Sequence, residues 1–301
     1  MAHLKVTLVV LGSVAIAWTV VYVAKKWILT VPTAGLSRKD QALIDRAKTY
    51  MKLCGHRQEF ERFRIYDLEW HPWVDSSHIQ PNYGVEAHGK IDNRLVYVRL
   101  SKTSLSLVGL GDGSDLPHQS MEHAKQPYAF DTEEKAQSLA LSYAQKLFPN
   151  WRLRAETRQY WTGAREGVRR RGTAKFAIRR LVGDHEFIQG AADIHINTRD
   201  GTCSDIVVFP LPRITAPPVV KVTKSEAFKA AKILHDARVS QLGWWAPHVE
   251  ETARLTYVFE VEVDASIETS RIEKYYVDAE SGRLLRREFV GRTHSVTDFS
   301  Y

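Results

Sequence analysis

The stretch YYVDAESGRLL, residues 275–285, decides the fold that we predict for this chain. A run that favours a strand leads into Asp278, a short turn ends at Gly282, and a second strand continues through Leu284. An aspartate side chain can bond the backbone of the turn that it opens, and glycine is suited to a positive φ angle. The pattern therefore predicts an antiparallel hairpin with its turn just before Leu284.

A second stretch, IHINTRDG at residues 194–201, repeats this pattern with Asn197 in place of the aspartate and Gly201 closing the turn. Alternating strands precede the two hairpins, at residues 175–181 and 256–263. An earlier region has the same layout but lacks the turn glycine. Its strands are expected near residues 60–70, 83–91, 95–100 and 105–110. The sequence thus predicts three related antiparallel sheets, the first of them diverged.

Each predicted sheet follows a predicted helix that opens with a capping pair, a short polar residue and an acid three positions later. The pairs are Ser37 with Asp40, Asp131 with Glu134, and Thr223 with Glu226. Apolar residues spaced by three and four give each helix one face to bury. These faces are Leu43, Ala47, Tyr50, Met51 and Cys54; Ala136, Leu139, Ala140, Tyr143, Ala144 and Leu147; and Ala227, Ala230, Ala231 and Leu234.

The helix start TKSEAFKAA, residues 223–231, together with YYVDAESGRLL resembles the PepSY domain, a small module of one helix and an antiparallel sheet. The middle region resembles it more weakly, and the first region only in layout. The resemblance implies a non-catalytic, extracytoplasmic module, of the kind found in propeptides of thermolysin-like metallopeptidases and in membrane-anchored proteins with proposed inhibitory or regulatory binding. Because the matching residues are fold residues, no family active site transfers to this chain.

The N-terminus carries a 19-residue run without a charge, VTLVVLGSVAIAWTVVYVA at residues 6–24. As a helix this run spans roughly 28 Å, about the hydrocarbon thickness of a bilayer. Its end has Tyr22 where a cleavable signal peptide needs a small residue, which favours an uncleaved anchor. Lys5, Lys25 and Lys26 flank the run on both sides, so charge does not decide which side the soluble part occupies.

We therefore predict an α+β fold in which an N-terminal transmembrane helix is followed by tandem PepSY-like units. The predicted segments are the anchor at residues 1–30, a diverged unit at 31–125, and further units at 126–213 and 214–301. The expected location is the membrane, with a single pass and the soluble part on the extracytoplasmic side.

Composition excludes several protein classes. The chain has 301 residues, of which 44% are hydrophobic and 26% charged, so it is not a disordered, collagenous or coiled-coil protein. The formal net charge is +7. Two cysteines exclude a disulfide scaffold and a cysteine-only zinc site, and the sequence leaves open whether Cys54 and Cys203 pair.

No catalytic, cofactor-binding or metal motif emerges, so we expect no enzyme activity and no cofactor. The run HEFIQ at residues 185–189 has glutamine where a zinc protease needs its second histidine, and it lies among strand-like residues. An alternative is a metal-dependent hydrolase whose site is built on one loop. Its candidate ligands are Asp112, Asp115, His118 and His123.

One cationic surface stands out on a predicted strand. Arg169, Arg171, Lys175 and Arg179 have the same parity along RRRGTAKFAIRR. In one interpretation the residues form a solvated face or pair with Glu260 and Glu262 of the following region. In the other they bind an anionic partner such as lipid headgroups, a wall polymer or an acidic protein. Aromatic residues are not interleaved with the basic ones, which argues against nucleic acid.

The favoured function is that of a non-catalytic, membrane-anchored binding or regulatory protein, with modulation of a peptidase as one form of that role. The alternative remains the hydrolase on the loop of residues 112–123.

The anchor can be tested by membrane fractionation. We expect the full-length chain to stay with the membranes after an alkaline carbonate wash, because residues 6–24 are long and apolar enough to span the bilayer. Recovery of a soluble chain that starts after residue 30 would instead show a cleaved signal.

Overall fold

The computed structural model describes residues 37–57, 59–68, 82–89, 95–112, 129–161, 172–198, 200–234, 236–249, 251–266 and 269–293. Three helices lie in these ranges: α2 (Arg38–Leu53), α4 (Glu133–Leu147) and α5 (Lys224–Ala230). The strands are β1 (Phe60–Leu68), β2 (Asn82–Gly89), β3 (Leu95–Ser101), β4 (Leu107–Asp112), β5 (Arg152–Trp161), β6 (Thr173–Val182), β7 (His185–Phe187), β8 (Ala192–Asn197), β9 (Cys203–Val208), β10 (Ala237–Trp245), β11 (Arg254–Ser266), β12 (Thr269–Asp278) and β13 (Leu284–Thr293).

These elements confirm the α+β class, with a large, mixed and mainly antiparallel sheet. Each helix is followed by a set of strands that pair in the order β1-β2-β3-β4, β5-β6-β8-β9 and β10-β11-β12-β13. The short strand β7 comes between β6 and β8 in the chain and pairs with β6 and β10. No helix within the described ranges is long and apolar enough to cross a membrane. The predicted anchor at residues 1–30 lies outside the described residues.

By its internal contacts the chain divides into two compact units. The first comprises Met1–Leu147, Thr157–Phe176 and Ile194–Val208, and the second comprises Phe148–Glu156, Ala177–Asp193 and Phe209–Tyr301. The three-domain division at residues 31–125, 126–213 and 214–301 stays a prediction.

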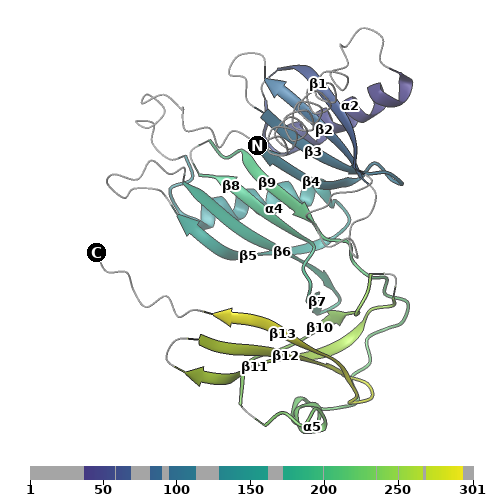
Figure 1. The fold of residues 1–301 in the computed structure, drawn as a ribbon, viewed down its shortest axis with the longest axis vertical. Helices are drawn as coiled ribbons and strands as arrows, with labels where there is room; N and C mark the ends of the chain where they lie inside the picture. The colour runs from purple at the N-terminus through teal and green to yellow at the C-terminus, as the bar shows by residue number, and fades with distance from the viewer. Residues whose placement is uncertain are drawn as a thin grey trace, which may run out of the picture. The chain divides into compact units, whose positions relative to one another are not determined.

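In the first unit, α2 lies against β2 and β3 (Figure 1). Leu43 and Met51 on α2 are buried, as are Val85, Val98 and Leu110, which are paired across β2, β3 and β4. Helical spacing gathers the first two side chains on one face, and strand alternation gathers the other three on one side of the sheet. The core of this unit therefore lies between α2 and alternate residues of antiparallel strands.

The second unit buries its core under α5, which contacts β11 and β12. Ala227 of α5 is buried with Phe259 and Trp244, and Phe228 meets the Phe259 ring edge-on with centroids 5.2 Å apart. The short strand β7 runs parallel to β10, which makes the sheet mixed.

The capping pairs are confirmed for two helices and displaced for the third. Ser37 Oγ accepts the Asp40 amide at 3.1 Å, and Thr223 and Glu226 form a reciprocal capping box. Asp131 was expected to open α4, but Thr132 Oγ1 accepts the Lys135 amide instead. The helix therefore starts one residue later than predicted.

The predicted buried faces hold for α2, largely for α4 and only in part for α5. All five predicted residues of α2 are buried, whereas Leu139 and Leu147 of α4 are half-buried. On α5, Ala230 is exposed, and Leu234 is 91% exposed. The prediction of Leu234 is wrong because α5 ends at Ala230 and Lys232 takes a φ of 53°, which carries the chain out of the helical register.

Three hairpins close with the same turn. In each, the amide of the fifth residue bonds the carbonyl of the first, and the amide of the first bonds the carbonyl of the sixth. All six N···O distances are 2.8 or 2.9 Å. The first, fifth and sixth residues are Ser101, Leu105 and Ser106 in β3–β4, Asn197, Gly201 and Thr202 in β8–β9, and Asp278, Gly282 and Arg283 in β12–β13.

The fifth residue takes a positive φ in every case, 52° at Leu105, 74° at Gly201 and 72° at Gly282. The hairpins predicted at the two glycines are thus confirmed. The first region lacks the turn glycine in its sequence, yet it forms the same turn, with a leucine in a conformation that side chains disfavour.

These turns predict a set of stability changes. Leu105→Gly should raise the free energy of unfolding by about 1 kcal/mol, because it relieves the left-handed strain, and Gly282→Ala should lower it by a similar amount. Gly201→Ala should cost more than Gly282→Ala, since its Cβ would lie 2.2 Å from Phe130 Cε2. Urea unfolding of the three variants measures these changes, and a destabilised Leu105→Gly variant would contradict the strain argument.

Candidate functional site

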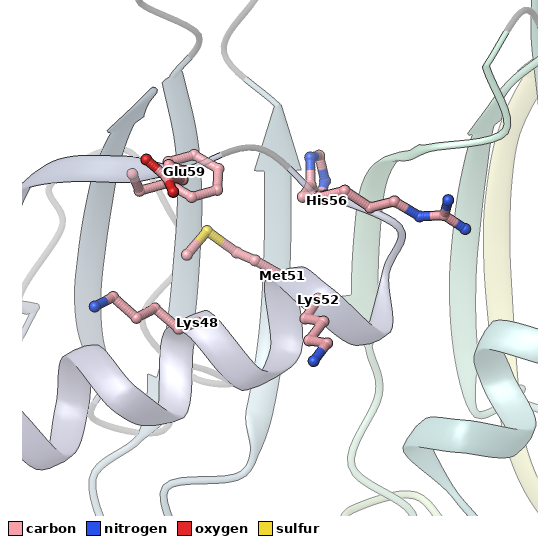
Figure 2. A pocket seen from close by; sticks show the side chains of 7 residues that line it. Lys48, Met51, Lys52, His56 and Glu59 are labelled. Atoms are coloured by element: carbon pink, nitrogen blue, oxygen red, sulfur yellow. The ribbon is translucent and has the colours of Figure 1, made fainter. Parts of the chain in front are cut away.

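A pocket of about 500 Å³ opens at the C-terminal end of α2, and we call it the basic pocket. It is lined by Lys48, Met51, Lys52, His56, Arg57, Glu59 and Phe60. Figure 2 shows Lys48, Met51 and Lys52 projecting from the last turns of the helix, with His56 and Glu59 on the segment that follows it.

The local sequence explains why these side chains converge. Lys48 and Lys52 are four residues apart, so they are neighbours on the helix surface. The helix then ends in a left-handed glycine turn: Gly55 has a φ of 88° and bonds the Lys52 carbonyl, while the His56 amide bonds the Met51 carbonyl. This ending reverses the chain, so that His56, Arg57, Glu59 and Phe60 line the same pocket as the last turns of α2.

His56 is anchored at the base of the basic pocket. Its side chain is buried, and its Nε2 lies 2.9 Å from the carbonyl oxygen of Cys203 on β9. A carbonyl oxygen only accepts hydrogen bonds, so Nε2 carries the hydrogen. The bond fixes the orientation of the ring and ties the segment after α2 to β9.

Cations dominate the rim of the basic pocket. Lys48, Lys52 and Arg57 are exposed, and Glu59 is the one carboxylate among the lining residues. The positive charge of Arg57 reaches the nearby Tyr143, where it opposes the burial that raises the pKa of that phenol to about 12. The pocket thus offers positive charge and N–H donors, which suit it to an anionic group.

The cationic strand predicted from the sequence is only partly described. Lys175 and Arg179 lie on β6, half-buried, while Phe176 and Ile178 between them are buried. Ala177, which has the same parity as the two cations, is also buried, so the side that carries them is not uniformly cationic. Arg169 and Arg171 lie outside the described residues, so binding of an anionic partner by the four residues stays a prediction.

Arg179 is engaged within the fold. Its Nη2 lies 3.0 Å from Glu156 Oε2 on β5, and its Nη1 donates to the Ile188 carbonyl at 2.6 Å. The alternative that paired it with Glu260 is wrong, since Glu260 binds Lys274 on the neighbouring strand at 2.6 Å. The acidic partner comes from β5, a strand that the sequence analysis did not predict.

Lys175 belongs to a mixed group of charges on the sheet. Its charge acts on Asp205 of β9, as do the charges of His195 and Arg99. His195 Nδ1 is 3.6 Å from Asp205 Oδ2. Burial outweighs these cations and raises the pKa of Asp205 above its usual range. Lys175 therefore faces local negative charge rather than forming an isolated cationic ridge.

The alternative metal site is mostly undescribed. Asp112 ends β4, while Asp115, His118 and His123 lie outside the described residues. Within the described ranges no three histidine, cysteine or acidic side chains are grouped so that they could hold a metal ion. His185, Glu186 and Phe187 form β7, in agreement with the strand expected there.

Sequence reasoning missed the basic pocket itself. The spacing of Lys48 and Lys52 with a glycine two residues after the helix was the available signal, because a left-handed glycine there returns the chain along the helix. Without a prediction of that turn, Arg57 and Glu59 had no spatial relation to the two lysines.

Comparisons with known proteins give little beyond this geometry. No family model matches the chain, and no curated protein matches it. Among solved structures it is similar to the Bacillus megaterium YpeB C-terminal domain, with a TM-score of 0.47 and 14% sequence identity. That match covers 84% of this chain and 97% of the other. Membership of the PepSY family stays a prediction.

Lys175 and Arg179 of β6 should differ in their structural contribution. Arg179→Met should lower the free energy of unfolding by about 1–3 kcal/mol, because it removes a guanidinium that is 11% exposed and that donates to the Glu156 carboxylate and the Ile188 carbonyl. Lys175→Met should change it by about 0.5 kcal/mol or less. Urea unfolding of both variants tests this, and equal effects would argue against a structural role for Arg179.

Proposed function

We propose that this chain is a non-catalytic, membrane-anchored binding protein whose soluble part holds an anionic partner in the basic pocket. The observation that carries the proposal is the exposure of Lys48, Lys52 and Arg57 around one pocket with a single carboxylate, Glu59, among its lining residues.

The arrangement is unfavourable in the absence of a partner. Like charges four residues apart on a helix repel each other, and Arg57 adds a third positive charge at the same end of α2. Lys48 contacts a neutral group, the Phe63 ring, whose centre lies 4.9 Å from its Nζ. A bound carboxylate or phosphate would relieve this repulsion, because it would interact with all three cations at once.

The apolar part of the lining narrows the class of partner. Met51 is buried beneath the rim, and Phe60 lies at the start of β1. A volume of about 500 Å³ lies within the range of pockets that hold small ligands or a few side chains. The best fit is a partner that carries an anionic group next to an apolar one.

Three further parts of the proposal rest on the sequence alone. The membrane anchor rests on the uncharged run at residues 6–24, and an extracytoplasmic position rests on the PepSY resemblance. A regulatory role towards a peptidase also rests on that resemblance. No observation favours the alternative hydrolase on the loop of residues 112–123.

The binding proposal is tested with the full chain in nanodiscs of zwitterionic lipid. We expect inorganic polyphosphate and poly-glutamate to bind at low salt, with an affinity that falls steeply as salt is added. Lys48→Gln, Lys52→Gln and Arg57→Gln combined should weaken binding at least tenfold.

A matched control removes the same charges elsewhere. Lys224, Lys229 and Arg283 are also exposed, two lysines and one arginine, and they lie in the second unit. Their combined change to glutamine should leave binding within about twofold, because none of the three lines the basic pocket. Equal losses in the two triple variants, or no binding by the unaltered chain at low salt, would overturn the proposal.

A further inference from the structure

The two cysteines of the chain meet in the interior of the first unit. Cys54 directly follows α2 and Cys203 begins β9, and both are completely buried. The amide nitrogen of Cys203 lies 3.0 Å from the carbonyl oxygen of Cys54. The sequence contains no other cysteine, so each has the other as its one intramolecular candidate for a crosslink.

The backbone positions suit a disulfide. The bond runs one way only, because the Cys54 amide bonds the carbonyls of Tyr50 and Met51. Backbones this close are within reach of a disulfide, whose Cα atoms lie roughly 4.4–6.8 Å apart. The next residues along each segment are also adjacent, since a Cβ on Gly55 would lie 3.6 Å from Thr202 Cα. The segment after α2 and the start of β9 therefore run side by side at the cysteines.

The side chains share one buried space. The charge of a Cys54 thiolate acts on Cys203, and both thiolates act on the phenol of Tyr143. The structure holds both cysteines as free thiols, and Cys203 Sγ donates to the Asp205 carbonyl at 3.3 Å. In the reduced form, therefore, the Cys203 thiol has a hydrogen-bond acceptor and Cys54 lies beside it.

We propose that Cys54 and Cys203 are a redox pair that closes as a disulfide in an oxidising compartment and fastens the end of α2 to β9. The oxidant is a disulfide, either oxidised glutathione or an oxidised thiol oxidoreductase. One cysteine thiolate attacks it to form a mixed disulfide, and the second displaces the carrier. The pair loses two electrons and two protons, and the oxidant leaves as two thiols.

Burial sets when the reaction occurs. It raises the pKa of Cys54 to about 12 and that of Cys203 well above its usual value. Because the thiolate is the reacting species, the folded, reduced chain exchanges slowly. The bond therefore forms while the chain folds, before these residues are closed off.

The crosslink would lie next to residues that line the basic pocket. His56, two residues after Cys54, donates to the carbonyl of Cys203 itself. A disulfide here would add a covalent bond to the hydrogen bonds that already hold the end of α2 against β9. This inference stands whether or not the pocket binds an anion.

The test refolds the full chain in detergent micelles, in buffers of reduced and of oxidised glutathione. After an acid quench, denaturation and alkylation, mass spectrometry counts the free thiols. We expect two free thiols after reduced refolding and none after oxidised refolding, with one Cys54–Cys203 peptide. The crosslinked form should melt at a higher temperature, since the bond closes a loop of roughly 150 residues.

Three controls make the outcome decisive. Cys54→Ser and Cys203→Ser should each form no intramolecular crosslink and should stop at a free thiol or at a mixed disulfide with glutathione. The double variant should melt at the same temperature in both buffers. The chain isolated from an oxidising secretory compartment and quenched in acid gives a second measurement that needs no refolding. Two alkylated thiols in a chain with native circular dichroism, from either oxidising preparation, would overturn the proposal.

Discussion

The sheet and the basic pocket both depend on turns in which a single residue adopts a positive φ angle. At Leu105, Gly201 and Gly282 it closes three hairpins with the same backbone pairing. At Gly55 it ends α2 and returns the chain along the helix. These four residues set where α2 and the strands β3, β8 and β12 stop, and therefore which of their apolar faces come together. Three of them are glycine, the residue for which this conformation carries no steric penalty.

Much of this fold could be predicted from the sequence, because its periodic patterns are local. Helix α2 buried the whole stripe from Leu43 to Cys54, since the spacing of three and four continues to the helix end. The prediction that Leu234 is buried was wrong because the apolar stripe continues in the sequence beyond the end of the helix, where Lys232 has a positive φ. Leu105 shows the opposite case, in which the turn persists without its signature residue. Apolar periodicity predicts which face of a helix or strand is buried, but it does not predict where the backbone changes conformation.

The candidate site was harder to predict because it depends on contacts between distant residues. Parity placed Lys175 and Arg179 on one side of β6. It could not supply Glu156, which comes from another strand and engages Arg179. The basic pocket also depends on a feature that the pattern does not show. Lys48 and Arg57 line the same pocket because the chain turns at Gly55. A cation drawn into the sheet serves the fold, whereas one left at a pocket rim is available to a partner.

The pairing of β4 with β9 has a consequence for how the chain is made. Leu110 of β4 stands opposite Ile206, the fourth residue of β9. The strands β1–β4 can pair as soon as they are synthesised, because each joins its neighbour through chain order. The outer side of β4 stays an open edge until about 100 further residues have emerged, and open edges recruit other strands. A chain that is made from its N-terminus thus passes through a stage with one unpaired β-edge, and during this stage it is open to pairing with other chains.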